Sequence, residues 1–157
     1  MKGSCQCGGV KYQINAESIA LVFCYCTDCQ KLSAGIGSYS MLVTADNFEV
    51  LSGDFSSYER VGNKGVRNLA HFCTDCGNRI YALNPESPGI VRVKAGTIDN
   101  ARALDPDAYV WMQSAPEWVR LPEGVLTYDT QPTLEEGLKA IQERRQYLTK
   151  RNCLNIQ

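Results

Sequence analysis

Apolar and polar residues alternate in short runs along most of the chain, which predicts β-strands with one buried face. In residues 10–14, Val10, Tyr12 and Ile14 alternate with Lys11 and Gln13, and residues 90–95 repeat the pattern. Further short strands are expected at residues 19–23, 39–44, 47–51, 56–60, 66–72, 79–83, 109–112 and 118–121. Residues 63–65 are expected to form a hairpin turn, and residues 85–89 and most of 96–107 to form loops.

One helix is expected at the C-terminal end of the chain. Thr133 followed by Glu136 is a capping-box pattern, in which side chains bond the free N–H groups of a first helical turn. Apolar residues then recur at helical spacing, at positions 134, 138, 141 and 148. The pattern predicts an amphipathic helix that covers one edge of the sheet. Residues 30–35 are expected to form a polar turn or a short helix.

Size and charge exclude some classes of protein. The chain has 157 residues, a formal net charge of −1 and a pI of about 5.8. The length fits one domain, and the charge gives no reason to expect nucleic acid or an anionic membrane as a partner. The first residues lack the apolar stretch of a signal peptide, and no apolar run reaches the ~18 residues of a membrane span. We therefore expect a cytoplasmic protein, in which thiols stay reduced.

Seven of the eight cysteines fall into three tight groups. The groups are Cys5 with Cys7, then Cys24 with Cys26 and Cys29, then Cys73 with Cys76. Disulfides between such close neighbours close only tiny loops and constrain the unfolded chain little. Zinc takes thiolates in a tetrahedron. Seven thiolates therefore predict one closed site with four ligands and a second site with three ligands and an open position.

Three motifs in this order resemble those of the glutathione-dependent formaldehyde-activating enzyme family, also called the GFA or CENP-V family. They read GSCQCGGVKY (residues 3–12), CYCTDCQKLSAG (residues 24–35) and FCTDCGN (residues 72–78). The resemblance extends over about residues 1–130, because SAPEW (114–118) and LPEG (121–124) are similar to the family's closing segment. It implies a zinc-binding domain over residues 1–130, with the helix and tail of residues 131–157 packed on the same domain.

The resemblance also implies a fold and two zinc ions. The fold is mainly β, with coiled small antiparallel sheets of zinc-ribbon-like (β-tent) type and, here, the C-terminal helix. One structural zinc would be held by four residues, Cys5, Cys7, Cys73 and Cys76. A second, catalytic-type zinc would be held by Cys24, Cys26 and Cys29. The sequence departs from the family where histidines are usual, at Tyr25 and at Ala108–Tyr109, and where a basic residue is usual, at Gln30.

The activity implied is that of a zinc-dependent enzyme of the carbon–sulfur lyase type. Its substrates would be a small thiol such as glutathione and an aldehyde such as formaldehyde, with S-hydroxymethylglutathione as the product. The alternative is a non-catalytic zinc-binding module, in which Asp28, His71, Cys153 or water fills the fourth position at the second zinc. A thioredoxin-like redox protein is disfavoured, because no βαβ pattern surrounds a Cys-x-x-Cys.

Several residues outside the cysteine groups are candidates for lesser roles. His71 is the only histidine and shares a strand face with Cys73, so it could be a base, a ligand or an ordinary strand residue. Cys153 stands alone beyond the expected helix, as a free and partly exposed thiol. Trp111 and Trp118 are expected in the core or in a cleft wall. Five basic residues could bind the carboxylates of glutathione or simply be solvated: Lys31, Arg60, Arg67, Arg79 and Lys94.

Overall fold

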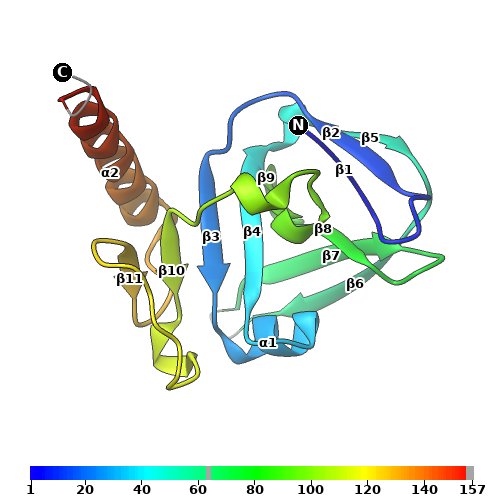
Figure 1. Cartoon of the computed structure of the whole chain (residues 1–157). Helices are drawn as coiled ribbons and strands as arrows, with labels where there is room; N and C mark the ends of the chain where they lie inside the picture. The colour runs from blue at the N-terminus through cyan, green and yellow to red at the C-terminus, as the bar shows by residue number, and fades with distance from the viewer. Residues whose placement is uncertain (63–64, 155–157) are drawn as a thin grey trace.

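The computed structural model describes residues 1–62 and 65–154, with the backbone alone for residues 151–154. Its strands form two sheets, and a long helix lies at the C-terminal end (Figure 1). The predicted mainly β fold with a C-terminal helix is confirmed. Among the described residues, no helix combines the length and apolar character that crossing a bilayer needs.

The smaller sheet has three antiparallel strands in the order β1-β2-β5. Their bounds are Lys2–Ser4 for β1, Lys11–Ile14 for β2 and Phe48–Ser52 for β5. The sequence predicted β2 and β5 within one residue at each end. It missed β1, which is too short to show an alternating pattern.

The larger sheet has eight strands in the order β11-β10-β3-β4-β9-β8-β7-β6. The bounds are β3 Ala20–Cys24, β4 Ser38–Thr44, β6 Phe55–Val61, β7 Arg67–Cys73, β8 Arg79–Asn84, β9 Ser87–Lys94, β10 Ala108–Val110 and β11 Leu126–Tyr128. Most pairs are antiparallel, but β10 is parallel to both β3 and β11. The expectation of antiparallel sheets alone is therefore wrong at this edge.

The loops and turns differ from the prediction in three places. Residues 87–89 belong to β9 rather than to a loop. Strand β10 ends at Val110 because Trp111 takes a left-handed backbone conformation, with φ 62°, and a 3-10 turn follows. Residues 118–121 form no strand. Of the turn expected at residues 63–65, residues 63 and 64 lie outside the described residues. The strands β6 and β7 on either side pair antiparallel, as the two strands of a hairpin do.

The core fills the space between the two sheets. The buried side chains of Tyr12 and Ile14 in β2, and of Val10 just before it, pack in one core with those of the large sheet. The residues of the large sheet in this core include Met41, Val43, Val91 and Val93. We call the face of the large sheet that carries these residues the inner face. Cross-strand pairing places Ala20, Leu42, Arg92, Ala82 and Ala70 side by side on the opposite, outer face.

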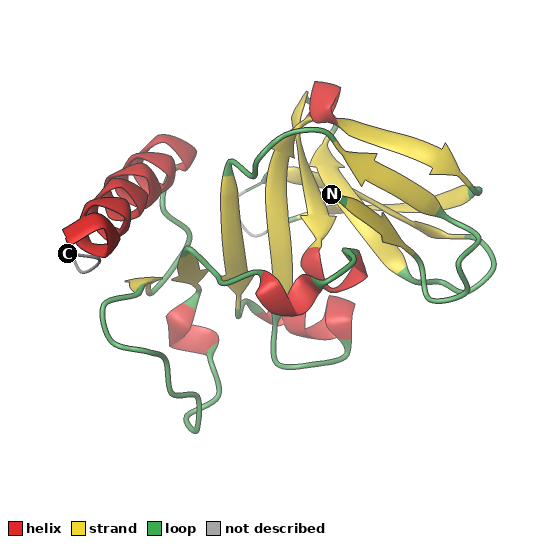
Figure 2. Cartoon of the chain, turned by 45° about the horizontal axis from the view of Figure 1, so that its top comes forward, coloured by secondary structure: helices red, strands yellow, loops and turns green. Residues whose placement is uncertain are grey.

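Two helices lie at the outer face. The short α1 spans Thr27–Ser33, and the long α2 spans Leu134–Leu154. Ile141 of α2 is buried against Ala20 and Ala108, with Leu138 beside it. Figures 1 and 2 show α2 beside β3, β10 and β11, at the far end of the sheet from β6. The helix therefore covers one edge as predicted, but it continues through Cys153, so this cysteine is not beyond the helix.

Candidate metal centres

Four cysteines that are distant in sequence meet in what we call the long-range cluster, Cys5, Cys7, Cys73 and Cys76. One Sγ atom from each lies within 4.8 Å of the others. The Sγ atoms of Cys5 and Cys7 are 3.3 Å apart, and those of Cys7 and Cys73 are 3.8 Å apart. Four thiols at this spacing suit a tetrahedral zinc site with no position left for a substrate.

Two tight turns bring these sulfur atoms together. Gly8 and Gly77 both have positive φ, at 77° and 69°, and their N–H groups donate to the carbonyl oxygens of Cys5 and Cys73. The N–H of Val10 also donates to Sγ of Cys5, at 3.2 Å. One turn follows β1, and the other joins β7 to β8. A metal ion here would join the small sheet to the large one.

Three cysteines that are close in sequence form the local cluster, Cys24, Cys26 and Cys29. Cys24 ends β3, Cys26 is the N-cap of α1, and Cys29 lies in the first turn of that helix. The N–H of Cys29 donates to Sγ of Cys26 at 3.4 Å. The sequence placed a turn or short helix at residues 30–35, but α1 starts at Thr27 because a cysteine sulfur serves as its cap.

The thiols of the local cluster cannot all ionise unaided. Hydrogen bonds from Cys24 and Cys29 lower the pKa of Cys26 to about 2. The same contact with Cys26 is the main reason that the pKa of Cys24 is raised. One thiolate thus suppresses ionisation of its neighbours, and three thiolates can coexist only when a cation neutralises them. This donor set therefore fits a zinc ion.

In the long-range cluster, too, neighbouring thiols lower the pKa of one cysteine and raise that of another. Burial raises the pKa of Cys5, but the N–H of Val10 and the neighbouring thiols outweigh it and lower the value to about 6. The N–H of Gly9 lowers the pKa of Cys7, but the thiols around it raise the value to about 12. All seven cysteines whose side chains are described are free thiols.

No fourth protein ligand joins the local cluster among the residues with described side chains. Asp28 is directed to Arg60, with 2.5 Å between its Oδ2 and the Arg60 guanidinium. His71 stacks on Tyr81, with ring centroids 4.3 Å apart, and burial lowers its pKa. His71 lies on the face of Cys73, as expected, but belongs to neither cysteine cluster. The side chain of Cys153 lies outside the described part.

The basic candidates divide between the two faces of the large sheet. Arg67 is on the inner face and pairs with Glu59 and Glu86, so it is remote from the local cluster. Lys31 is exposed in the last turn of α1. The remaining three candidates, Arg60, Arg79 and Lys94, lie on the outer face together with Arg92. Arg92 is not among the candidates predicted from the sequence, although its alternation with Val91 and Val93 places it on the face of Lys94.

The two positions that lack the family's histidines are in contact. The ring of Tyr25 stacks on that of Tyr109, with centroids 6.4 Å apart and an angle of 18° between the planes. Phe23 packs against both tyrosines. Tyr25 is only 3% exposed. Two stacked tyrosine rings therefore occupy the region in which members of the family usually have histidines.

Gln30 joins α1 to the segment after β10. Its side-chain amide donates to the carbonyl oxygens of Tyr25 and Ser114, at 2.7 and 2.8 Å. Trp111 is half-buried near the start of this segment, whereas Trp118 is 67% exposed. The prediction that Trp118 belongs to the core or to a cleft wall is therefore wrong.

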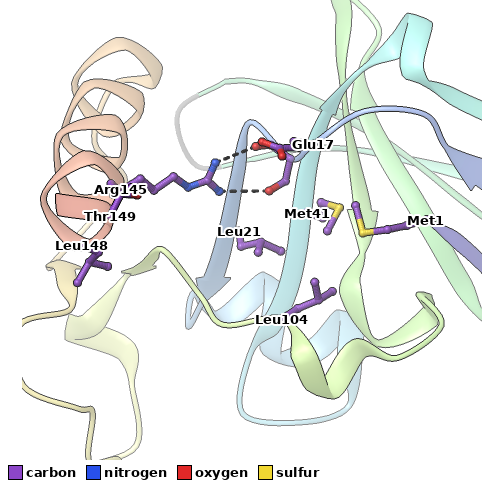
Figure 3. Close-up of a pocket in the computed structure, with 9 residues that line it drawn as sticks. Met1, Glu17, Leu21, Met41, Leu104, Arg145, Leu148 and Thr149 are labelled. Atoms are coloured by element: carbon purple, nitrogen blue, oxygen red, sulfur yellow. Dashed lines mark hydrogen bonds between the residues drawn. The ribbon is translucent and has the colours of Figure 1, made fainter. Parts of the chain in front are cut away.

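A cleft of about 580 Å³ lies between α2 and the body of the protein (Figure 3). Its walls include Leu21, Met41 and Leu104 on one side and Arg145 and Leu148 on the other. The Arg145 guanidinium crosses the cleft and donates to Ser18. None of the seven cysteines with described side chains lines this cleft, so it is separate from both cysteine clusters.

The cysteine motifs agree with a known family. The family model for the glutathione-dependent formaldehyde-activating enzyme matches residues 1–114. The chain belongs to this family. Both cysteine clusters fall inside the matched residues, whereas β11 and α2 follow them.

Two individual proteins are similar to this member of the family. One, from Halomonas elongata, bears the name "Putative glutathione-dependent formaldehyde-activating enzyme" and is 27% identical over 127 residues, which cover 77% of this chain and 80% of the relative. The other is a Rhodobacter sphaeroides protein of known crystal structure, with a TM-score of 0.50 and 18% identity, covering 82% of this chain and 99% of that chain. The second similarity supports the fold.

Proposed function

We propose that the protein accelerates the addition of the glutathione thiol to formaldehyde, which gives S-hydroxymethylglutathione. Sulfur forms a bond to the formaldehyde carbon, the C=O π-bond breaks, and the thiol proton ends on the new hydroxyl. The reverse reaction breaks a carbon–sulfur bond, which makes the enzyme of the carbon–sulfur lyase type. Family membership and the name of the Halomonas relative support this proposal.

The observation that carries the proposal is the geometry of the local cluster. Its three Sγ atoms lie within 4.8 Å of one another, and no fourth His, Cys, Asp or Glu ligand joins them among the described side chains. Three protein ligands with an open position are the usual pattern of a catalytic zinc site. Cys24, Cys26 and Cys29 would hold this zinc, which when bound lowers the pKa of a thiol and polarises a carbonyl group.

The long-range cluster would hold a second, structural zinc, so we propose two zinc ions per chain. Four thiolates leave no coordination position for a substrate, and the role of this site would be to join the two sheets. Free thiols in both clusters fit a cytoplasmic location, where cysteines stay reduced.

The test is formaldehyde consumption in the presence of glutathione, measured against the spontaneous reaction. We expect acceleration by the wild-type protein and none by Cys26→Ser, with the fold of the variant confirmed by circular dichroism. If the wild-type protein with two zinc ions gives no acceleration, the activity is absent and the chain is a non-catalytic zinc-binding module.

A further inference from the structure

Four basic side chains gather on the outer face of the large sheet, next to the local cluster. This cationic cluster consists of Arg60 of β6, Arg79 of β8, and Arg92 and Lys94 of β9. Nothing in the addition of a thiol to an aldehyde requires four positive charges at this place. Their arrangement therefore calls for its own explanation.

Hydrogen bonds and strand register place the cluster beside the cysteines. Arg92 donates to the side-chain oxygen of Asn68 at 2.8 Å, and Asn68 is the cross-strand partner of Arg60. Lys94 donates from Nζ to Ser38 at 2.8 Å and to Ser40 at 3.2 Å. Ser38 is the cross-strand partner of Cys24, so the ammonium group lies next to the local cluster.

Arg79 completes the group. It is the cross-strand partner of Phe72, which is two residues from Ala70 on the outer face of β7. Burial, and then the charge of Arg60, lowers the pKa of both Arg79 and Arg92. Burial also lowers the pKa of Lys94, and the nearby Cys29 opposes this shift. The positive charges are therefore close enough to repel one another.

The surroundings neutralise only part of this charge. Asp28 forms an ion pair with Arg60, whose side chain is 25% exposed. Among the described residues, no carboxylate pairs with Arg79, Arg92 or Lys94. Zn²⁺ with three thiolates would have a net charge of −1 and could balance one more cation. About two positive charges remain without a counter-ion in a partly buried place, which is unfavourable unless an anion binds there.

Two buried nitrogen atoms of the cluster also lack partners. No described residue forms a hydrogen bond with one terminal nitrogen (NH1) of Arg79 or with Nε of Arg60, although both atoms are shielded from solvent. Buried donors are normally satisfied, and an unsatisfied one needs an explanation such as a missing ion or ligand. A bound anion would offset the charge of these guanidinium groups through their accessible nitrogen atoms.

We propose that the cationic cluster is an anion-binding site for a carboxylate of the thiol substrate, which orients the thiol toward the local cluster. The identity of the ligand rests on the proposed function, because glutathione has two carboxylates. The site would select thiols that carry a negative charge over neutral or cationic thiols of similar size. It is made by side chains of β6, β8 and β9, outside the three cysteine motifs.

The first experiment uses the wild-type, zinc-loaded protein and isothermal titration calorimetry. The ligands are glutathione and glutathione dimethyl ester, which has the same thiol but no carboxylate. Hydrogen bonds to charged groups predict that the ester binds at least about tenfold more weakly. The Kd for glutathione should also rise several-fold between about 0.05 and about 0.5 M NaCl, because salt screens exposed charges. Affinities for the two ligands within twofold of each other would overturn the proposal.

The second experiment compares two arginine variants. Arg79→Met keeps the aliphatic stem and removes the charge, so glutathione should bind about tenfold more weakly while the ester is unaffected. Arg67→Met is the matched control, because Arg67 is on the inner face, and it should leave both affinities unchanged. Zinc content and circular dichroism verify that each variant is folded. A loss of affinity for both ligands alike in Arg79→Met would mean that Arg79 has only a structural role.

The two proposals fail in different ways. If glutathione binds in a carboxylate-dependent manner but formaldehyde is consumed no faster than in the spontaneous reaction, the anion-binding site is supported and the proposed activity is refuted. If the protein accelerates adduct formation with glutathione and with its dimethyl ester equally, and binds both equally, the activity stands and the anion site does not.

Discussion

Gly37 lies against Cys24, so close that a Cβ atom on Gly37 would be 2.6 Å from the Cys24 carbonyl oxygen and 2.5 Å from the Phe23 ring. Gly37 directly precedes β4, whose first residue, Ser38, pairs with Cys24. The absence of a side chain here lets β4 approach the strand that ends in the local cluster. This contact links a position outside the cysteine motifs to the geometry of the candidate metal site.

Gly37→Ala should therefore disturb the local cluster. The added methyl group forces β3 and β4 apart, and overpacking of this kind costs about 1–3 kcal/mol of unfolding free energy. Gly35→Ala is the control, because the nearest heavy atom to its Cβ would be 3.4 Å away. Urea unfolding gives the stability, and native mass spectrometry counts the zinc. Equal behaviour of the two variants would show that the close contact at Gly37 has no influence on the site.

Cys73→Ser and Cys26→Ser should each lose one zinc ion but differ in stability. The long-range cluster connects the two sheets, and a structural zinc can contribute on the order of 10 kcal/mol. The thermal midpoint of Cys73→Ser should thus fall by more than about 10 °C, whereas that of Cys26→Ser falls by only a few degrees. Native mass spectrometry should find two zinc ions in the wild-type protein and one in each variant. A wild-type count of one would instead indicate that the local cluster does not retain zinc.

Arg145→Ala should weaken the attachment of α2. Arg145 contacts Asp107 at 2.5 and 2.8 Å and also donates to Ser18, and the Asp107 side chain is only 10% exposed. Removal of the guanidinium leaves a nearly buried carboxylate with the N–H of Leu21 as its remaining partner. After allowance for the partial exposure of Arg145, we expect a loss of about 2 kcal/mol in urea unfolding.

Arg144→Ala is the matched control for Arg145→Ala. Arg144 is next in the same helix, and its bond to the Gly124 carbonyl oxygen is exposed and long, at 3.3 Å. Its removal should change stability by less than about 0.5 kcal/mol. Similar losses in both variants would mean that helix propensity, and not the ion pair with Asp107, determines the effect.

Glu136→Gln should remove a pH-dependent contribution to stability at the start of α2. Thr133 donates to the Glu136 carboxylate from its hydroxyl and from its N–H, which lowers the pKa of this carboxyl below 4.5. A carboxyl with a lowered pKa in the folded state stabilises the fold fully above its unfolded pKa and loses this effect as the pH falls through the folded value. The wild-type protein should therefore have the higher thermal midpoint at pH 6.

The difference between the wild-type protein and Glu136→Gln should shrink as the pH falls below about 4.5. Comparison of the two proteins at each pH cancels any zinc loss that both share. A difference that is constant from pH 6 to pH 3 would show that the carboxylate does not stabilise the helix through its charge.

The alternating pattern predicted the strands well where one face is buried and the other exposed. Strands β2, β4 and β8 start and end within one residue of the expected positions. The pattern missed β1 and β11, two strands of only three residues that are too short to alternate recognisably. It also failed at residues 118–121, which form a loop in which Trp118 is exposed while Val119 and Leu121 are half-buried.

The sequence revealed the cysteine groups but not their surroundings. Spacing identified the three groups of cysteines, because residues two or three positions apart are close in any fold. The resemblance to the family, and not spacing, joined the first group to the third as one candidate ligand set, since Cys7 and Cys73 are 66 positions apart. The sequence offered Arg60, Arg79 and Lys94 as candidates for binding a carboxylate, but it could not show that they form one cluster with Arg92. These residues come together only through the pairing of β6, β7, β8 and β9. The parallel pairing of β10 with β3 joins residues 86 positions apart and has no local signal in the sequence.

The two cysteine clusters also differ in when they can form. The local cluster is complete within six residues, whereas Cys7 and Cys73 are separated by 66 positions. The 47 residues from Cys29 to Cys76 take roughly 2–9 s to synthesise at the usual rate of translation. During that interval the nascent chain already offers three thiols to a metal ion, although the fold around them does not exist. Closure of the long-range cluster requires both sheets, so zinc capture there would mark the completion of folding.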